Sequence, residues 1–174
     1  LTADNDFRPD VEKLKSLITP KTKLIIINNP GNPTGGIFEK EDILAIADIL
    51  KDRPDIFVLS DEIYDRLCHG EAQPFSIASI PEMKDRTIIL DGFSKPYSMT
   101  GWRIGYGVMN RAIADAMTTL MINSNSCVAA FTQQAALAAL EGPQDIVDTM
   151  KNAYKERLEY LVGELNKIEG ISCL

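Results

Sequence analysis

Short blocks of hydrophobic residues alternate along this chain with longer segments of mixed polarity. Four of these blocks are too short for helices and predict strands, at 24–28, 56–60, 87–90 and 104–109. The first block is apolar almost throughout, which predicts a strand that is buried on both faces. Between the first two strands, a helix is predicted over about 39–51, with a buried stripe of Ile43, Leu44, Ala47 and Leu50. A strand, a helix and a strand in succession predict parallel pairing.

Further helices are predicted before and after this core. Pro9 suits the first position of a short helix, whose apolar side is formed by Val11, Leu14, Leu17 and Ile18. Asn110 is placed to cap a helix that continues to about Met121. The segment 128–140 is apolar nearly all round and predicts a buried helix, and a long amphipathic helix begins at Asp145.

The remaining segments predict loops and one further strand. The segment 67–85 has little periodicity and predicts a loop with a short helical turn near 74–80. The interval between the third and fourth strands has no helical pattern, so the fourth strand is predicted to run antiparallel. The last residues, 170–174, are expected to begin another strand. Together the elements predict an α/β fold, a three-layer α/β/α sandwich with a mostly parallel sheet.

Composition and charge exclude several classes of function. The 174 residues are 45% hydrophobic and 25% charged, as in ordinary globular proteins. A net charge of −7 argues against nucleic-acid and anionic-membrane partners, and no apolar run approaches the roughly 20 residues that cross a bilayer. Cys68, Cys127 and Cys173 are scattered, which is typical of unbridged thiols in a reducing, cytoplasmic compartment. With His69 as the single histidine, a histidine-rich metal centre and a histidine-based triad are not expected.

Three polar motifs follow three of the predicted strands. They are Asn-Pro-Gly-Asn-Pro-Thr-Gly at 29–35, Asp-Glu-Ile-Tyr at 61–64, and the segment 94–103, which begins Ser-Lys and ends Gly-Trp-Arg. Because open α/β sheets bind ligands at the carboxyl ends of their parallel strands, we expect the three motifs to meet in one crevice.

In order and spacing, these motifs resemble those of the class I and II aminotransferases that depend on pyridoxal 5′-phosphate (PLP), which are enzymes of fold type I. The resemblance implies the large, PLP-binding domain of such an enzyme, with its core at 1–142. Residues 143–174 would form a long connecting helix and the start of a truncated small domain. It also implies PLP as cofactor, an amino acid and a 2-oxo acid as substrates, ping-pong amino transfer between them, and a homodimer.

The resemblance also assigns a role to each motif residue. Lys95 would bind the cofactor aldehyde and then move the Cα proton of the substrate, whereas an unremarkable loop lysine would be solvated. Asp61 would pair with the pyridine nitrogen, or cap the turn after its strand. Tyr64 would donate to the phenolic oxygen of the cofactor, or pack in the core. Asn32 would donate to the same oxygen and help hold the substrate carboxylate.

The phosphate of the cofactor would be held by Ser94 and Arg103, since a guanidinium fork suits a dianion. Gly101 would allow the backbone to approach closely. The resembled enzymes often carry a serine at the position of Gly92, so one phosphate-binding hydroxyl is expected to be absent here.

The resemblance covers nearly all of this chain but less than half of a typical member. A second phosphate loop and a ring-stacking aromatic residue would precede Leu1, and the arginine that grips the substrate carboxylate would follow Leu174. The chain is therefore expected to be an internal fragment with an incomplete site. Two alternatives stay open: other PLP chemistry, such as C–S β-lysis or aminocyclopropane-carboxylate synthesis, and a catalytically silent truncated domain.

Overall fold

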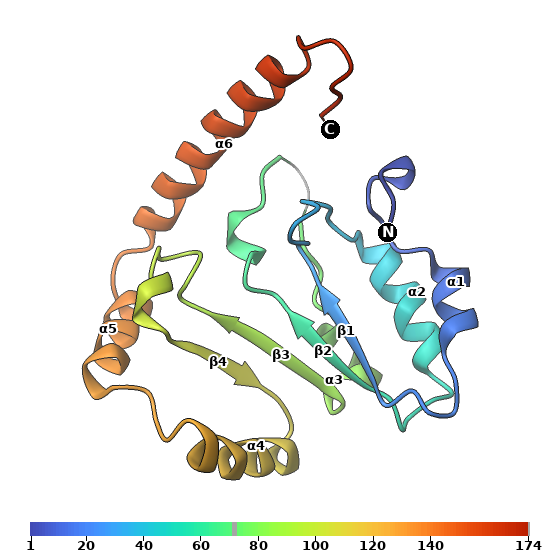
Figure 1. The fold of residues 1–174 in the computed structure, drawn as a ribbon. Helices are drawn as coiled ribbons and strands as arrows, with labels where there is room; N and C mark the ends of the chain where they lie inside the picture. The colour runs from blue at the N-terminus through green and yellow to red at the C-terminus, as the bar shows by residue number, and fades with distance from the viewer. Residues whose placement is uncertain (71–72, 174) are drawn as a thin grey trace.

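The fold is a four-stranded mixed sheet with helices, as a computed structural model describes it for residues 1–70 and 73–173 (Figure 1). The strands lie in the order of the sequence: β1 (Leu24–Asn28), β2 (Phe57–Asp61), β3 (Thr87–Gly92) and β4 (Gly105–Val108). The β1–β2 and β2–β3 pairs are parallel, and β4 runs antiparallel to β3. The α/β class with a mostly parallel sheet and the reversed fourth strand are both confirmed.

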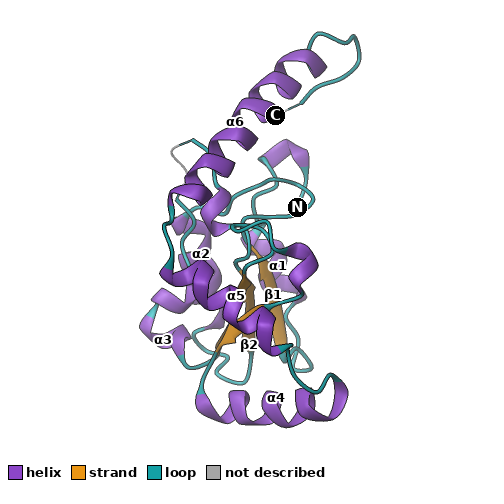
Figure 2. Ribbon diagram, turned by 90° about the vertical axis from the view of Figure 1, so that its left-hand side faces the viewer, coloured by secondary structure: helices purple, strands orange, loops and turns teal. Residues whose placement is uncertain are grey.

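Six α-helices accompany the sheet in the described part of the chain: α1 (Val11–Leu17), α2 (Lys40–Leu50), α3 (Pro81–Lys84), α4 (Arg111–Ser124), α5 (Ala130–Glu141) and α6 (Asp145–Leu165). Short 3₁₀ turns are η1 (Ala3–Asn5), η2 (Asp65–Leu67), η3 (Ile77–Ser79) and η4 (Thr100–Trp102). Figures 1 and 2 both show α6 extending away from the sheet toward the C-terminus. None of the helices in the described ranges has the length and apolar character needed to span a membrane.

Helices α1 and α4 each begin at a residue whose side chain caps the first turn. Asn110 caps α4 as predicted, since its side chain accepts a hydrogen bond from the Ile113 amide at 3.0 Å. The prediction for Pro9 is wrong: the cap of α1 is Asp10, whose carboxylate accepts from the Lys13 amide at 2.9 Å. Pro9 therefore precedes the helix, because an aspartate satisfies the free amides of the first turn directly.

The predicted loop is found in the structure, whereas the predicted final strand is not. The loop at 67–85 contains the expected turn as η3, followed by α3, while its residues 71–72 lie outside the described residues. Residues 170–173 form no strand, and Leu174, the last residue of that prediction, lies outside the described part of the chain.

The main core lies between the sheet and α2. Ile27, Val58, Leu50 and Ile43 are at most 4% exposed there. The predicted stripe of α2 is wrong at one position, since Leu44 is 43% exposed and Ile46 is buried in its place. The buried set 43, 46, 47 and 50 repeats at intervals of three and four, which is the face that one side of a helix presents.

Several apolar surfaces that the sequence predicts as buried are exposed. On β1, Ile26 is 67% exposed, so burial on both faces is wrong for this strand in this chain. On α5 the buried residues are Thr132 and Ala136, whereas Phe131 is 72% exposed. On α6 the buried residue is Val147. The physical reason is tertiary: apolar patterning indicates which faces need cover, and the described residues supply cover for only part of them.

A close approach of β3 and β4 explains the glycine at position 92. Gly92 pairs with Gly105, and a Cβ on Gly92 would lie 2.8 Å from the Gly105 Cα. Because the conflicting atom belongs to the backbone, it cannot move aside as a flexible side chain would. A serine hydroxyl at this position would therefore require the two strands to separate.

We expect Gly92→Ser to lower the free energy of unfolding by about 1–3 kcal/mol, since it overpacks the β3–β4 contact. Gly163→Ala in α6 is the matched control: a Cβ there meets no atom within 4 Å, and helix propensity predicts a gain of up to about 1 kcal/mol. Urea unfolding of the full-length protein measures both changes. Equal midpoints for Gly92→Ser and the unmodified protein would contradict the close-approach explanation.

Candidate active site

The three motif segments begin at the same end of the sheet, where the parallel strands β1, β2 and β3 finish. In the parallel register, Asn28 pairs with Asp61, and Asp61 pairs with Leu90. Two further backbone bonds extend this alignment past the strands, from the Asn29 amide to the Asp61 carbonyl at 3.1 Å and from the Glu62 amide to the Leu90 carbonyl at 2.9 Å. The expectation that the motifs share one end of the sheet is therefore confirmed.

The loop at 29–35 is held by its own hydrogen bonds. The Asn28 side chain accepts from the Asn32 amide at 2.8 Å, and the buried Asn29 side chain accepts from the Phe38 amide at 2.8 Å. Gly35 has a φ of 72°, a conformation that glycine adopts without steric cost. Because the backbone is fixed in this way, the exposed Asn32 side chain is presented in a defined direction.

Asn32, Tyr64 and Lys95 come together from three different loops. The Asn32 side-chain amide donates to the Tyr64 hydroxyl at 3.0 Å. The Lys95 ammonium lies 5.6 Å from the centre of the Tyr64 ring. Within residues 1–70 and 73–173, the Lys95 Nζ makes no hydrogen bond or ion pair, so no carboxylate competes for it there. Lys95 is thus a half-buried residue whose ammonium lies beside the Asn32–Tyr64 pair.

Asp61 lies at the last position of β2 and is half-buried. One of its carboxylate oxygens accepts from the Ile63 amide at 3.4 Å. This bond is the one that a turn-capping aspartate makes. A role as a cap and a role as a partner for a bound cation are compatible in this geometry, because the carboxylate keeps further acceptor positions.

Ser94 and Arg103 are linked through Thr100. The Thr100 hydroxyl donates to the Ser94 carbonyl at 2.9 Å, and Arg103 donates to the Thr100 carbonyl at 3.0 Å. Arg103 is exposed and has a φ of 53°, a left-handed conformation that is costly for a residue with a side chain. At Gly101 a Cβ would meet no atom within 4 Å, so packing within the described residues does not require a glycine there.

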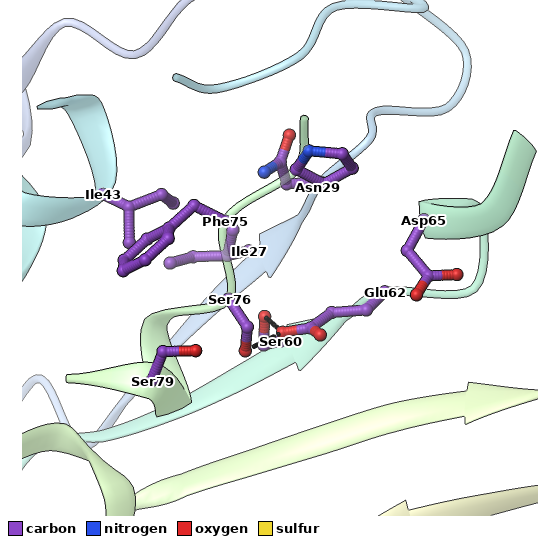
Figure 3. A pocket seen from close by; sticks show the side chains of 10 residues that line it. Ile27, Asn29, Ile43, Ser60, Glu62, Asp65, Phe75, Ser76 and Ser79 are labelled. Carbon is purple, nitrogen blue, oxygen red and sulfur yellow. Dashed lines mark hydrogen bonds between the residues drawn. The ribbon is translucent and has the colours of Figure 1, made fainter. Parts of the chain in front are cut away.

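One carboxyl group near the site, that of Asp65, has a raised pKa. Burial, with the nearby charge of Asp91, raises the pKa of Asp65, and Glu62 adds to the effect. Glu62 in turn accepts hydrogen bonds from the hydroxyls of Ser60 at 2.8 Å and Ser76 at 2.6 Å, at the wall of a cavity of about 240 Å³ (Figure 3). Burial also raises the pKa of Tyr106, whose hydroxyl donates to Asp91 at 2.7 Å.

Burial shifts the pKa values of two other residues, Cys68 and His69, in the direction that favours their neutral forms. Burial raises the pKa of the Cys68 thiol to about 11, so this buried side chain is not a thiolate at neutral pH. Burial lowers the pKa of His69, and the positive charges of Lys151 and Lys155 lower it further, which favours neutral imidazole.

Sequence reasoning missed the side chains that support the site. It assigned no role to Glu62 or Tyr97 and did not single out Arg66, Asp91 or Tyr106. In the structure, Tyr97 accepts from Arg66 at 2.7 Å, and both contact Gln144. No local signal connects residues 47 positions apart, so the Tyr97–Gln144 contact becomes visible only in the fold.

Comparisons with known proteins point in one direction. Residues 1–174 match the family model described as aminotransferase class I and II. An aspartate aminotransferase of Geobacillus stearothermophilus is 43% identical over 171 residues, which cover 98% of this chain and 43% of that protein. The crystal structure of the aspartate aminotransferase from Rhizobium meliloti superposes with a TM-score of 0.96 at 33% identity, over all of this chain and 44% of that one. An aromatic aminotransferase from Pyrococcus horikoshii superposes with a TM-score of 0.91 at 36% identity, over 95% of this chain and 45% of its own. The chain thus spans less than half of the length of each of these proteins.

Proposed function

The chain belongs to the class I and II aminotransferase family, and from that premise we propose that the protein transfers amino groups between an L-amino acid and a 2-oxo acid with the help of PLP. Members of this family are PLP-dependent. The observation that carries the proposal is the meeting of Lys95 with the Asn32–Tyr64 pair at the carboxyl end of the parallel strands.

The chemistry of the side chains at this edge of the sheet fits PLP. The cofactor carries an aldehyde, a basic ring nitrogen, a phenolic oxygen and a phosphate, and each needs a different partner. Lys95 provides an amine without a competing hydrogen bond among the described residues, and Asp61 provides a carboxylate. The Asn32–Tyr64 pair provides donors, and Arg103 provides an exposed guanidinium. Ser94, the residue before Lys95, supplies a further hydroxyl.

Each residue would then have a defined role, and Lys95 would have two. When bound, PLP supplies an aldehyde that captures amines and a ring that delocalises the electrons left when Cα loses its proton. Lys95 would hold PLP through its amine, and the same amine, when free, would take the Cα proton of the substrate and give it back as a general acid. Asp61 would keep a proton on the ring nitrogen. Asn32 and Tyr64 would orient the ring through its phenolic oxygen, and Ser94 and Arg103 would hold the phosphate.

The names of the relatives support aspartate as the amino donor. Several of the relatives most similar in sequence bear the name aspartate aminotransferase, while one structural neighbour is an aromatic and another an alanine aminotransferase. We therefore propose aspartate as amino donor and 2-oxoglutarate as acceptor for the full-length protein. The proposal includes a cytoplasmic homodimer with no nucleic-acid or membrane partner, a PLP-binding core at 1–142, and a connecting helix with the start of a second domain at 143–174.

A product assay on the full-length protein tests this function. With aspartate and 2-oxoglutarate we expect glutamate and oxaloacetate in equal amounts, with no release of ammonia. A β-lyase would instead release ammonia from a sulfur-containing amino acid without needing an oxo acid. Ammonia release in place of glutamate formation would assign the other PLP chemistry, and no turnover with any amino acid would contradict the proposal.

A further inference from the structure

Arg66, Tyr97 and Gln144, which we call the 66–97–144 cluster, form a closed set of hydrogen bonds next to the candidate site. One guanidinium nitrogen of Arg66 donates to the Tyr97 hydroxyl at 2.7 Å and to the Gln144 side-chain oxygen at 2.9 Å. The Tyr97 hydroxyl donates to the same Gln144 oxygen at 2.9 Å. The Arg66 guanidinium also lies 5.4 Å from the centre of the Tyr97 ring. All three side chains are half-buried, where such bonds are less weakened by water than on an open surface.

The cluster joins three segments that are distant in the sequence. Arg66 belongs to η2, two residues after Tyr64, and the Leu67 amide bonds to the Tyr64 carbonyl at 3.0 Å. Tyr97 follows Lys95 by two residues in a turn closed by the bond from the Ser98 amide to the Lys95 carbonyl at 3.3 Å. A displacement of Tyr97 therefore moves Lys95 as well. The bond between Arg66 and Tyr97 fixes the separation of the two turns.

Gln144 brings the junction of α5 and α6 into the same set. Its amide donates to the carbonyls of Ala139 at 2.9 Å and Gly142 at 2.8 Å, which are free acceptors at the end of α5. Gln144 is also the residue before the first turn of α6. The turn that carries Lys95 packs on α5, since Phe93 and Met99 form a cluster with Ala136 of that helix. Through Gln144, the end of α5 and the start of α6 are thus hydrogen-bonded to the side chain of Tyr97, two residues after Lys95.

The placement of Lys95 depends on this backbone. Among the described residues its ammonium makes no hydrogen bond, and its side-chain contact is with the face of the Tyr64 ring at 5.6 Å, which is only weakly directional. Apolar packing alone is not directional, whereas hydrogen bonds from a guanidinium fix both distance and orientation. We propose that Arg66, Tyr97 and Gln144 are positioning residues that hold the Lys95 turn against the Tyr64 turn and tie both to the α5–α6 junction. The proposal rests on the proposed function in that Lys95 is the reacting amine.

Two conservative substitutions in the full-length protein test the cluster. Tyr97→Phe removes the hydroxyl and keeps the ring, and Arg66→Lys keeps the charge but replaces the guanidinium, one nitrogen of which donates to both Tyr97 and Gln144, by a shorter side chain. Tyr160→Phe is the control, because Tyr160 is 68% exposed on α6. Each protein is treated with a limiting amount of PLP and cyanoborohydride, and the label on Lys95 is divided by the label on Lys84 of the same molecule. Amide hydrogen exchange is followed in parallel at 62–67, 93–99 and α2.

We expect either substitution to lower the Lys95-to-Lys84 labelling ratio about tenfold, as loss of a hydrogen bond to a charged group would. The double variant should lower this ratio no further, since the residues act as a unit. Exchange should rise at 62–67 and 93–99 and stay constant in α2, whereas general unfolding would raise all three. A ratio and an exchange pattern equal to those of Tyr160→Phe would overturn the proposal. If Lys95 of the unmodified protein is labelled no faster than Lys84, the proposed function fails. The hydrogen-exchange pattern alone then decides whether the 66–97–144 cluster couples the turns of Tyr64 and Lys95.

Discussion

Replacing Lys95 by alanine in the full-length protein is expected to lower the rate of amino transfer by about 10⁴-fold, the upper range for loss of a positioned acid–base group. Lys95 is the residue that would both bind the cofactor aldehyde and move the Cα proton, so a single substitution removes two tasks. Its ammonium lies 5.6 Å from the Tyr64 ring and has no carboxylate partner among the described residues, so little folding stability should be lost with it. Steady-state rates with aspartate and 2-oxoglutarate measure the effect.

Lys84→Ala is the matched control for this experiment. Lys84 is exposed in the last turn of α3 and has no part in the proposed mechanism. We expect that variant to keep the rate of the unmodified protein. A Lys95→Ala protein that is folded, binds PLP and turns over at the normal rate would remove the assignment of Lys95.

Asp61→Asn is expected to lower the same rate by about 10²–10³-fold, the loss that follows removal of one preorganised electrostatic partner. The substitution keeps the shape of the side chain and removes its charge, so the ring nitrogen would lose the carboxylate that keeps it protonated. Rates and urea unfolding should be measured together, because they separate the two interpretations of Asp61. Asparagine can still accept the hydrogen bond from the Ile63 amide, which is 3.4 Å from Asp61 in this structure.

The two interpretations therefore give opposite results for this variant. If Asp61 acts as a turn cap alone, Asp61→Asn should retain both stability and activity. If it acts on the cofactor, activity falls while the unfolding midpoint stays near that of the unmodified protein. Asp115→Asn, which changes an exposed ion pair with Arg111, should alter neither quantity by more than a small amount.

The local features of this protein could be predicted from the sequence because they depend on neighbouring residues. The strand positions, the cap at Asn110 and the reversed fourth strand follow from short patterns, and the structure confirms them. The three motif segments also meet at one edge of the sheet, because the parallel register places Asn28 beside Asp61. The cofactor roles assigned to the motif residues stay predictions, which the substitutions above would test.

What the sequence could not reveal depends on contacts across the fold. Apolar residues in β1 and α5 predict burial, but Ile26 and Phe131 are exposed, since exposure depends on which other segments cover a face. On α2 both Leu44 and Ile46 are apolar, so the sequence pattern does not determine which of them is buried. The rotation of the helix against the sheet buries Ile46. The hydrogen bonds of Arg66, Tyr97 and Gln144 join segments with no shared local pattern. The reason for a glycine at position 92 is visible only in the structure, because it depends on the close approach of Gly105.

The central claim is that Lys95 is the residue of this chain that binds PLP. The most direct measurement is to add PLP to the full-length protein, reduce it with borohydride, and locate the modified peptide by mass spectrometry. We predict a single major label on Lys95, diminished when Asp61 or Arg103 is replaced. A label spread over many lysines, or concentrated on a lysine other than Lys95, would contradict the account.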